Sequence, residues 1–507
     1  MFIRKKKNKS GIVSIQIIDK SSGFYKVYQT IGSSSDPTEI ENLYNTAKQE
    51  LLSISEQSSL PFESNDELEY VHTFIKSIDT LSLIGPELLL GKLFNEIGFN
   101  QIKDVLFKYL VITRLVYPVS KLKTTDYLFK YKGLSISVYS IYRYLDKLHK
   151  HQIELIKNIS LKHTLKVLNN LLAVVFYDVT TLYFEASDED DFRKAGFSKD
   201  GKHQQPQIVL GLLVSTGGYP LDYDVFEGNK YEGDTMLPVI EHFIKKHNPE
   251  QLIVIADAGL LSNKNISLLK QKNYQYILGA RIKNESNSLK EAILKLTLKD
   301  KESVLIDKED GSKLIISYKE NRAKKDAANR KKGYEKLLLK IKSGKLTKTN
   351  INNKGYNKYL KLDGETLISI DESKYKDDSK WDGLKGYLSN TTLSKEDVIE
   401  KYNQLWQIEK TFRISKTDLQ IRPIYHYLKR RIEAHICISF AACKIYKELE
   451  RQLKLKKSNY SPEQVIDILK TIYQISFKTP YSKNMHNKLI LKTKEQKSVI
   501  NLFNLEI

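Results

Sequence analysis

The sequence of 507 residues contains little cysteine and no long apolar run. Its two cysteines, Cys437 and Cys443, lie six residues apart in one apolar stretch that we expect to be helical. They are therefore poorly placed to bond to each other, they exclude a zinc site built from cysteine alone, and they fit a reducing cytoplasm. No run of about 18 uncharged apolar residues occurs, which excludes a membrane-spanning helix. The basic first residues are followed by no apolar segment, so we expect no signal peptide.

Acidic residues are outnumbered. Lysine and arginine total 82 against 61 aspartates and glutamates, a formal charge of +21. Such an excess predicts a polyanionic partner, with nucleic acid first and an anionic membrane second. A lysine-rich composition imposed by an AT-rich genome is an alternative source of part of it. No phosphate-binding Gly-x4-Gly-Lys-Ser/Thr loop occurs, which disfavours an ATP-driven motor.

The first third of the chain changes from strands to helices. Residues 1–80 predict a small basic β module followed by a polar helical linker, and residues 81–171 predict a helical region. Within it, residues 120–150 have the pattern of a helix-turn-helix, with Ser135 or Ser137 as N-cap. Arg143 and Lys147 lie on the polar side of its second helix and are candidate DNA contacts. The alternative is an ordinary packed helix pair.

From residue 172 the pattern becomes that of an α/β protein. Strands are predicted at 172–184, 206–215, 219–228, 251–259 and 274–282. Helices are predicted at 233–248, with Asp234 as N-cap, and at 264–272. The element order of this first core part, 172–282, is therefore β-β-β-α-β-α-β.

Residues 283–390 interrupt this core with a β-rich, basic insertion. Positions 321–350 hold 11 basic and 2 acidic residues, which would add salt-dependent affinity for DNA. The candidate DNA contacts in this stretch are Arg322, Lys324, Lys325 and Arg330. The second core part is expected at 391–450, with one helix over 394–419, and a basic helical tail at 451–507.

Two aspartates stand out by their position relative to the predicted strands. Asp178 interrupts the first core strand, and Asp257 directly follows the fourth. If these strands are neighbours, the two carboxylates converge, and they then need a cation between them. Carboxylate oxygens suit Mg²⁺ or Mn²⁺, and two such ions can activate an attacking oxygen and stabilise a leaving one.

A third acid, Glu409, lies on the predicted 394–419 helix. Residues seven apart drift by only about 20° on a helix, so Tyr402, Glu409 and Lys416 would share one stripe, with Arg413 beside it. An acid flanked by cations and a tyrosine suits a metal ligand next to a phosphate backbone. The alternative is an exposed amphipathic helix with ion pairs four residues apart.

Several motifs in this order resemble those of DDE transposases. "YNQLWQIEKTFRISK" resembles the Tyr-x2-Arg-x3-Glu-x6-Lys signature, except that Leu405 stands at the arginine position. "YDVTTLYFE" and "VIADAGL" resemble the motifs of the first and second aspartates. "FEGNKYEGDTM" resembles the segment before the second aspartate, and "WDGLKGYLSN" and "RPIYH" resemble members with a β-rich insertion. The similarity spans about residues 85–450.

The resemblance implies a ribonuclease H-like mixed sheet with a β-rich insertion before the catalytic glutamate. It implies an insertion-sequence transposase of a bacterial cytoplasm and nucleoid, cut-and-paste in mode, with Asp178, Asp257 and Glu409 as catalytic metal ligands for two Mg²⁺ or Mn²⁺ ions. The substrates would be double-stranded element ends and target DNA, held by a homodimer on paired ends. Trp381 would be a base-stacking residue or a core tryptophan, and Arg422 a DNA contact. The alternatives are a metal-dependent nuclease without strand transfer and a non-catalytic DNA-binding protein.

Overall fold

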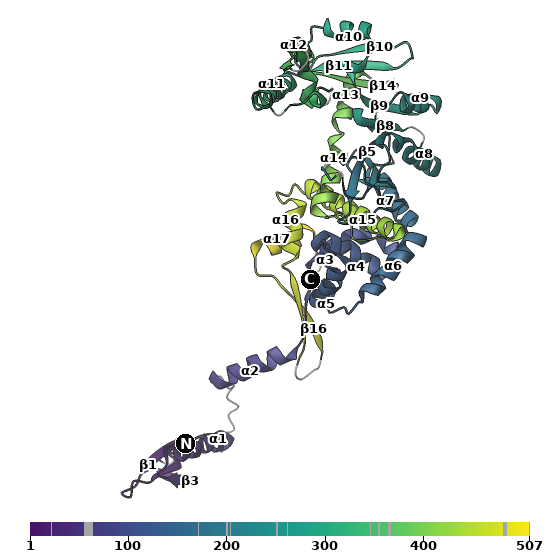
Figure 1. Cartoon of the computed structure of the whole chain (residues 1–507). Coiled ribbons are helices and arrows are strands. Elements are labelled where there is room, and N and C mark those ends of the chain that lie inside the picture. The colour runs from purple at the N-terminus through teal and green to yellow at the C-terminus, as the bar shows by residue number, and fades with distance from the viewer. Residues whose placement is uncertain are drawn as a thin grey trace. The chain divides into compact units, whose positions relative to one another are not determined.

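The computed structural model describes the chain except residues 22, 55–63, 171, 199–200, 203, 250–251, 261, 345, 353–354, 364–366, 480–483 and 506–507. The chain divides into two compact units (Figure 1). One contains Met1–Asp79 and Ser476–His486, and the other contains Thr80–Ile475 and Asn487–Ile507. The division points fall within strands β4 (Ile78–Leu83), β15 (Tyr473–Lys478) and β16 (Met485–Ile490).

The first unit contains the small β module expected from the sequence. Strands β1 (Phe2–Lys7), β2 (Val13–Asp19) and β3 (Lys26–Ser34) form an antiparallel sheet in that order. Helix α1 (Pro37–Ile54) packs against β2 and β3. This packing buries a small core that contains Ile15 and Ile17 of β2, which lie two residues apart and so share one face of the strand. Helix α2 (Ser64–Ser77) follows.

The second unit begins with a layer of helices. They are α3 (Gly85–Ile97), α4 (Val105–Val116), α5 (Lys121–Lys132), α6 (Val138–His151) and α7 (Ile153–Val167). Helices α3, α4, α6 and α7 pack around the 27-residue helix α15 (Lys429–Leu455), which buries both cysteines as free thiols. Gly133 ends α5 with φ 64° and Ser137 caps α6, so the helix-turn-helix outline is present.

A mixed eight-stranded sheet forms the centre of this unit, in the order β10-β11-β14-β9-β8-β5-β6-β7 (Figure 1). Strands β5 (Val174–Tyr183), β6 (Gln207–Ser215) and β7 (Pro220–Glu227) are antiparallel. Strands β8 (Ile253–Ala256) and β9 (Gln275–Ala280) run parallel to β5. With helices α8 (Met236–His247) and α9 (Asn263–Gln271) between them, the predicted β-β-β-α-β-α-β order is confirmed.

The helix predicted at 233–248 begins later than expected. Residues Glu232–Asp234 form a 3₁₀ turn, and the N-cap of α8 is Thr235, whose side chain makes no capping hydrogen bond. The prediction of Asp234 as N-cap is therefore wrong, because the preceding turn takes up that residue.

The 283–390 segment extends the central sheet. Three of its strands, β10 (Ser303–Asp307), β11 (Lys313–Tyr318) and β14 (Leu384–Ser389), continue the sheet from β9, all antiparallel. Its other elements are α10 (Asn287–Leu294), the 23-residue α11 (Glu320–Lys342), strands β12 (Leu360–Asp363) and β13 (Leu367–Ile370), and α12 (Glu372–Ser379). After it come α13 (Lys395–Asn403), α14 (Trp406–Arg413), α16 (Pro462–Leu469) and α17 (Lys494–Leu502). The domain boundaries drawn from the sequence stay predictions.

Each face of the sheet has its own core. Apolar side chains of α8 and α9 cover one face, and those of α14 and α15 cover the other. Both faces of β5 and β6 are buried, which is why these strands read as continuous apolar runs. No helix of the described residues is long and apolar enough to cross a membrane.

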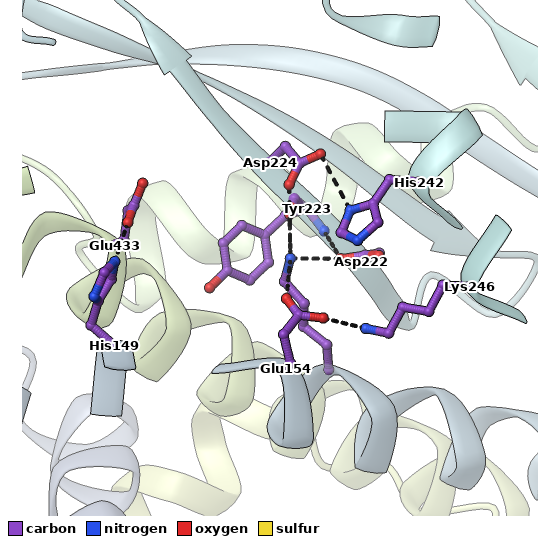
Figure 2. A network of polar contacts seen from close by, with 9 residues as sticks. His149, Glu154, Asp222, Tyr223, Asp224, His242, Lys246 and Glu433 are labelled. Carbon is purple, nitrogen blue, oxygen red and sulfur yellow. Dashed lines mark hydrogen bonds and ion pairs between the residues drawn. The ribbon is translucent and has the colours of Figure 1, made fainter. Parts of the chain in front are cut away.

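A buried ion pair joins the helical layer to the sheet (Figure 2). The ammonium of Lys157 on α7 lies 2.9 Å from Asp222 Oδ1 on β7 and donates to the carbonyl oxygen of Tyr223 at 2.7 Å. Burial works against the charged lysine, but Asp222 and two further carboxylates outweigh it, so the pKa of Lys157 is raised. Figure 2 shows Glu154 of α7 reaching Lys246 of α8 in the same network. The pair therefore fixes α7 against β7, the edge strand of the sheet.

Candidate active site

The two aspartates, Asp178 within β5 and Asp257 directly after β8, lie side by side. In the parallel pairing of β5 with β8, Tyr177 is opposite Ala256, and Asp178 and Asp257 are the next residues of the two chains. Neighbouring strands are about 4.8 Å apart. Side chains alternate along a strand, so Asp178 shares a face with Phe176, and Asp257 shares a face with Ile255. Both of these residues belong to the core covered by α14 and α15, so the two carboxylates face the same side of the sheet.

Tyr402 orients the second aspartate. Its hydroxyl donates to Asp257 Oδ1 at 3.1 Å, while its ring is only 4% exposed. Burial, and then the negative charge of Asp257, raise the pKa of Tyr402, so the hydroxyl stays protonated and remains a donor. Asp178 is half-buried, and its Oδ1 accepts the backbone N–H of Val179 at 2.8 Å. Each aspartate is thus held by a hydrogen bond, which fixes the direction of its carboxylate.

The helix that carries Glu409 is not continuous. Helix α13 ends at Asn403, α14 begins at Trp406, and a π-helical turn, Ile414–Asp418, follows it directly. The prediction of one helix over 394–419 is therefore wrong, and so is the single stripe of Tyr402, Glu409 and Lys416. Tyr402, before the break, is buried, whereas Glu409, after it, is exposed, and the wider π turn shifts Lys416 from its seven-residue spacing. Such π turns are frequent at functional sites.

Lys385 links the second and third acids. It lies on β14, with its ammonium 4.4 Å from the centre of the Tyr402 ring. Burial and the nearby Arg322 lower the pKa of Lys385, whereas the charges of Asp257 and Glu409 act to raise it. Its ammonium is therefore within electrostatic reach of both acids. Sequence reasoning missed this residue, although it lies inside the "WDGLKGYLSN" motif.

The acids partly fit a divalent metal. Asp178 and Asp257 supply hard oxygen ligands at the same level of one sheet face, as a metal site needs. No group of three or more histidine, cysteine, aspartate or glutamate side chains among the described residues is close enough to hold a metal ion. The structure thus pairs the two aspartates, and Glu409 lies on the helix packed over the same face without completing the set.

A cavity of about 720 Å³ opens from Asp257 into the insertion. Its lining contains Asp257 and Tyr402 together with Arg322, Arg330 and Trp381, which the sequence had separated by up to 145 residues. Trp381 is half-buried and packs partly against a small core of the insertion, with the ammonium of Lys283 6.0 Å from its ring centre. The tryptophan therefore contacts both the core of the insertion and the cavity.

The basic residues predicted to contact DNA in the insertion differ in exposure and in their ion pairs. Arg330 is 11% exposed and bonded to Asp382, so it braces the insertion. Arg322 lies 3.5 Å from Asp326, and Lys324 pairs with Glu320 at 2.7 Å, one turn apart on the exposed side of α11. Lys325 is exposed on the same helix.

The remaining predicted cations lie on other elements. Arg413 is exposed at the end of α14, and Lys416 is half-buried in the π turn. Arg143 is exposed on α6, and Lys147 pairs with Asp104 at 2.9 Å. Arg422 lies over the ring of Tyr183 at 5.5 Å. The DNA contacts predicted for all of these residues stay predictions.

The family of the chain follows from its match to a known family. The family described as transposase DDE domain matches residues 170–443, more than half of the chain. The chain belongs to the DDE transposase family. The matched range of this DDE transposase includes Asp178, Asp257 and Glu409 and the whole central sheet, which confirms the fold class expected from the sequence. DDE transposases are phosphoryl-transfer enzymes that act on DNA.

Solved structures similar to this DDE transposase include other transposases bound to DNA. A cryo-EM structure of the piggyBac transposase synaptic complex with hairpin DNA is 11% identical, with a TM-score of 0.36, and covers 76% of this chain and 79% of that chain. The Mos1 transposase paired-end complex with the left transposon end is 12% identical, with a TM-score of 0.16 and coverages of 33% and 56%. The Mos1 mariner paired-end complex with Mn is 12% identical, with a TM-score of 0.15 and coverages of 31% and 54%. A search of curated proteins returned no match.

Proposed function

We propose that this DDE transposase cuts DNA at the ends of its own insertion sequence and joins the freed 3′-hydroxyl ends to target DNA, in a cut-and-paste reaction. The observation that carries the proposal is the placement of Asp178 and Asp257 side by side on one face of the sheet, beneath the helix of Glu409. Two carboxylates held this close repel each other unless a cation lies between them.

Asp178, Asp257 and Glu409 are the proposed ligands of Mg²⁺ or Mn²⁺, with two ions in the complete site. When bound, the ions would activate the attacking oxygen and stabilise the leaving one. Tyr402 keeps Asp257 pointed at the site through its hydroxyl. Lys385, close to both Asp257 and Glu409, offers a positive charge to a phosphate that approaches the acids.

The cavity beside Asp257 is the proposed place for the DNA strand that reacts. Its basic wall would hold the backbone, and Trp381 would stack on a base displaced from the duplex, since stacking on an aromatic ring tolerates any base. Arg143, Lys147, Lys325 and Arg413 are proposed contacts for the duplex outside the cavity. The active form is proposed to be a homodimer that holds two element ends, in the bacterial cytoplasm where the element's DNA lies.

Asp257→Asn tests this proposal. We expect the variant to lose Mg²⁺-dependent nicking of a plasmid carrying the sequences that flank the gene, and to keep wild-type affinity for the same DNA in a gel-shift assay. Removing a metal ligand need not disturb phosphate contacts. Asp307→Asn, an exposed aspartate on β10 of the same sheet, is the matched control and should nick like the wild type.

Three outcomes would count against the proposal. Loss of DNA binding together with nicking in Asp257→Asn would make Asp257 structural. Full nicking by Asp257→Asn would remove it from the site. A wild-type protein that nicks, but that never joins a pre-cleaved end to target DNA, would be a metal-dependent nuclease.

A further inference from the structure

A second cavity has a volume of about 490 Å³. It is lined in part by the segment 420–426, which follows the helix of Glu409 in the sequence. Its walls come from the end of α4, the start of α5, one residue of α6, the 420–426 segment and α15. Its basic or titratable lining residues are Arg114, Lys121, Lys123, Arg422, His426 and His435. No aspartate or glutamate is among the described residues that line it.

Two cations and a histidine form the buried part of this cavity. Arg114, Lys121 and His435 are each only 5% exposed. Nε2 of His435 lies 3.0 Å from the carbonyl oxygen of Ile421, which can only accept, so Nε2 carries the hydrogen. Nδ1 is then an acceptor, and it faces Lys121 Nζ at 3.4 Å and Arg114 Nη2 at 3.5 Å. His435 Nδ1 is thus an acceptor shared by both side chains, and Arg114 Nη1 also donates to the carbonyl oxygen of Gln420 at 3.5 Å.

Burial is costly for these cations. It lowers the pKa of Arg114 to about 10 and that of Lys121 well below its ordinary value, and the charge of Arg114 lowers the pKa of Lys121 further. Arg114 still carries its charge at neutral pH. Taking an unpaired ion out of water is strongly unfavourable.

Acids near the cavity are engaged elsewhere. Asp146 on α6 accepts from Arg430 at 2.8 Å and from Arg431 at 2.9 Å. Arg431 in turn packs over the ring of Tyr142, a residue of the cavity wall, at 5.0 Å. Within the part of the chain that the structure describes, no carboxylate forms an ion pair with Arg114 or Lys121. The buried charge is therefore left for a ligand.

The shape of the site suits an anion of phosphate size or larger. Its volume is in the range of ligand pockets. Lys121 is the first residue of the 12-residue helix α5, so the backbone N–H groups and the positive end of that helix reinforce the two cations. At the rim, Lys123 and Tyr425 are exposed, with 60% of Tyr425 accessible, and could border a longer molecule.

We propose that this cavity, built around Arg114, Lys121 and His435, binds a phosphate group of a DNA strand. The bound DNA strand would lie between the start of the helix-turn-helix and the segment that follows the Glu409 helix. The helical region and the catalytic domain would then contact the same DNA backbone. The phosphate chemistry follows from the cavity alone, whereas the assignment to DNA rests on the proposed function.

Lys121→Met tests the phosphate site, because methionine is unbranched and only one atom shorter than lysine, and it removes the charge. Melting temperatures are measured in sodium phosphate and in sodium chloride at matched ionic strength. Phosphate also stabilises proteins by exclusion from their surfaces, so Lys130→Met, an exposed lysine on the same helix, is the matched control. We expect wild type and Lys130→Met to gain more from phosphate than Lys121→Met gains. Without phosphate, Lys121→Met should melt no lower than wild type, since a buried unpaired charge has been removed.

Duplex DNA is the second probe. Each phosphate contact adds about −0.9 to the slope of log K against log salt. We expect Lys121→Met to bind with a slope shallower by about 0.9, and Lys130→Met to keep the wild-type slope. The rim variant Lys123→Gln changes an exposed side chain and cannot unfold the chain, so it gives a second reading if Lys121→Met folds poorly; it should weaken both the phosphate response and the slope in part.

Equal phosphate responses and equal slopes in all the variants would overturn the proposal. A phosphate response that depends on Lys121, with unchanged DNA slopes, would assign the cavity to free phosphate and overturn the DNA assignment. Neither measurement requires cleavage, so failure of the proposed transposase activity is seen separately, as absence of nicking by the wild type with Mg²⁺.

Discussion

Replacing Tyr402 with phenylalanine would remove one hydroxyl from the candidate active site and little else. That hydroxyl donates to Asp257 Oδ1 at 3.1 Å, and the ring lies between Tyr387, with ring centres 5.0 Å apart, and the ammonium of Lys385. Phenylalanine keeps the buried ring and its packing, so we expect the fold to be retained. Asp257 loses the bond that orients it and becomes free to rotate on the exposed end of β8.

The size of the effect follows from the type of bond. A hydrogen bond to a charged group contributes about 1.5–3 kcal/mol, and the exposure of Asp257 to solvent places this one near the lower end, at roughly 1–2 kcal/mol. Since 1.36 kcal/mol is a tenfold change in rate, nicking at subsaturating Mg²⁺ should fall roughly 5- to 30-fold. If Tyr402 acts by orienting a metal ligand, raising the Mg²⁺ concentration should restore much of the rate.

The assay is the initial rate of nicking of element-end DNA over a Mg²⁺ titration, with DNA affinity measured in parallel. Tyr387→Phe is the matched control, because its hydroxyl lies 3.5 Å from Ser317 Oγ and it is a buried tyrosine of the same cluster. A Tyr402→Phe protein with the same Mg²⁺ dependence as Tyr387→Phe would refute the reasoning. Weaker DNA binding with unchanged Mg²⁺ dependence would instead make Tyr402 a phosphate contact.

Two further predictions concern buried charges that hold the site's supports in place. Lys157→Met leaves Asp222, 2% exposed, without its partner, so stability should fall by about 3–5 kcal/mol, or roughly 4–6 °C in Tm for a unit of about 400 residues. The double variant Lys157→Met/Asp222→Leu should recover most of this loss. If the single variant Lys157→Met melted at the wild-type temperature, the pair would not join α7 to β7. Burial is the largest single influence on the pKa of Glu450 and raises it. Lys410 and Lys447 together outweigh burial and lower this pKa from an ordinary 4.5 to about 2. Its contribution to stability is therefore present above pH 4.5 and lost as the pH falls towards 2, so the Tm difference between wild type and Glu450→Gln should close across that window. A difference that stays constant there would contradict the assignment.

The central strands were predictable because their continuous apolar pattern indicates strands that are buried on both faces. Apolar, β-branched runs such as those of β5 and β6 are buried on both faces, and only an inner strand of an α/β sheet requires that. A run of this kind contains Asp178, and another is followed directly by Asp257, so the pairing of these acids needed one assumption, that β5 and β8 are neighbours. The pairing of Tyr177 with Ala256 confirms it.

The helix of Glu409 could not be read in the same way. Helical periodicity runs through residues 394–419 without a glycine or proline, so nothing local marks the break after Asn403 or the π turn at Ile414–Asp418. The break comes directly after Tyr402, whose hydrogen bond to Asp257 spans 145 residues. The strands of the 283–390 segment are similar, because β14 finds its place beside β9 only through pairing between distant parts of the chain.

The sequence by itself determined the order of the core elements, the three acids and the basic character of the chain, because strand patterns, charges and motif order are local properties. The tertiary structure alone decided which charges are buried. Arg114, Lys121 and Lys157 look like surface residues in the sequence, yet packing removes all three from water. Lys157 pairs with two aspartates there, whereas Arg114 and Lys121 have only neutral acceptors, the ring of His435 and, for Arg114, the carbonyl oxygen of Gln420. That difference depends on which helices meet, and it separates a structural ion pair from a proposed binding site.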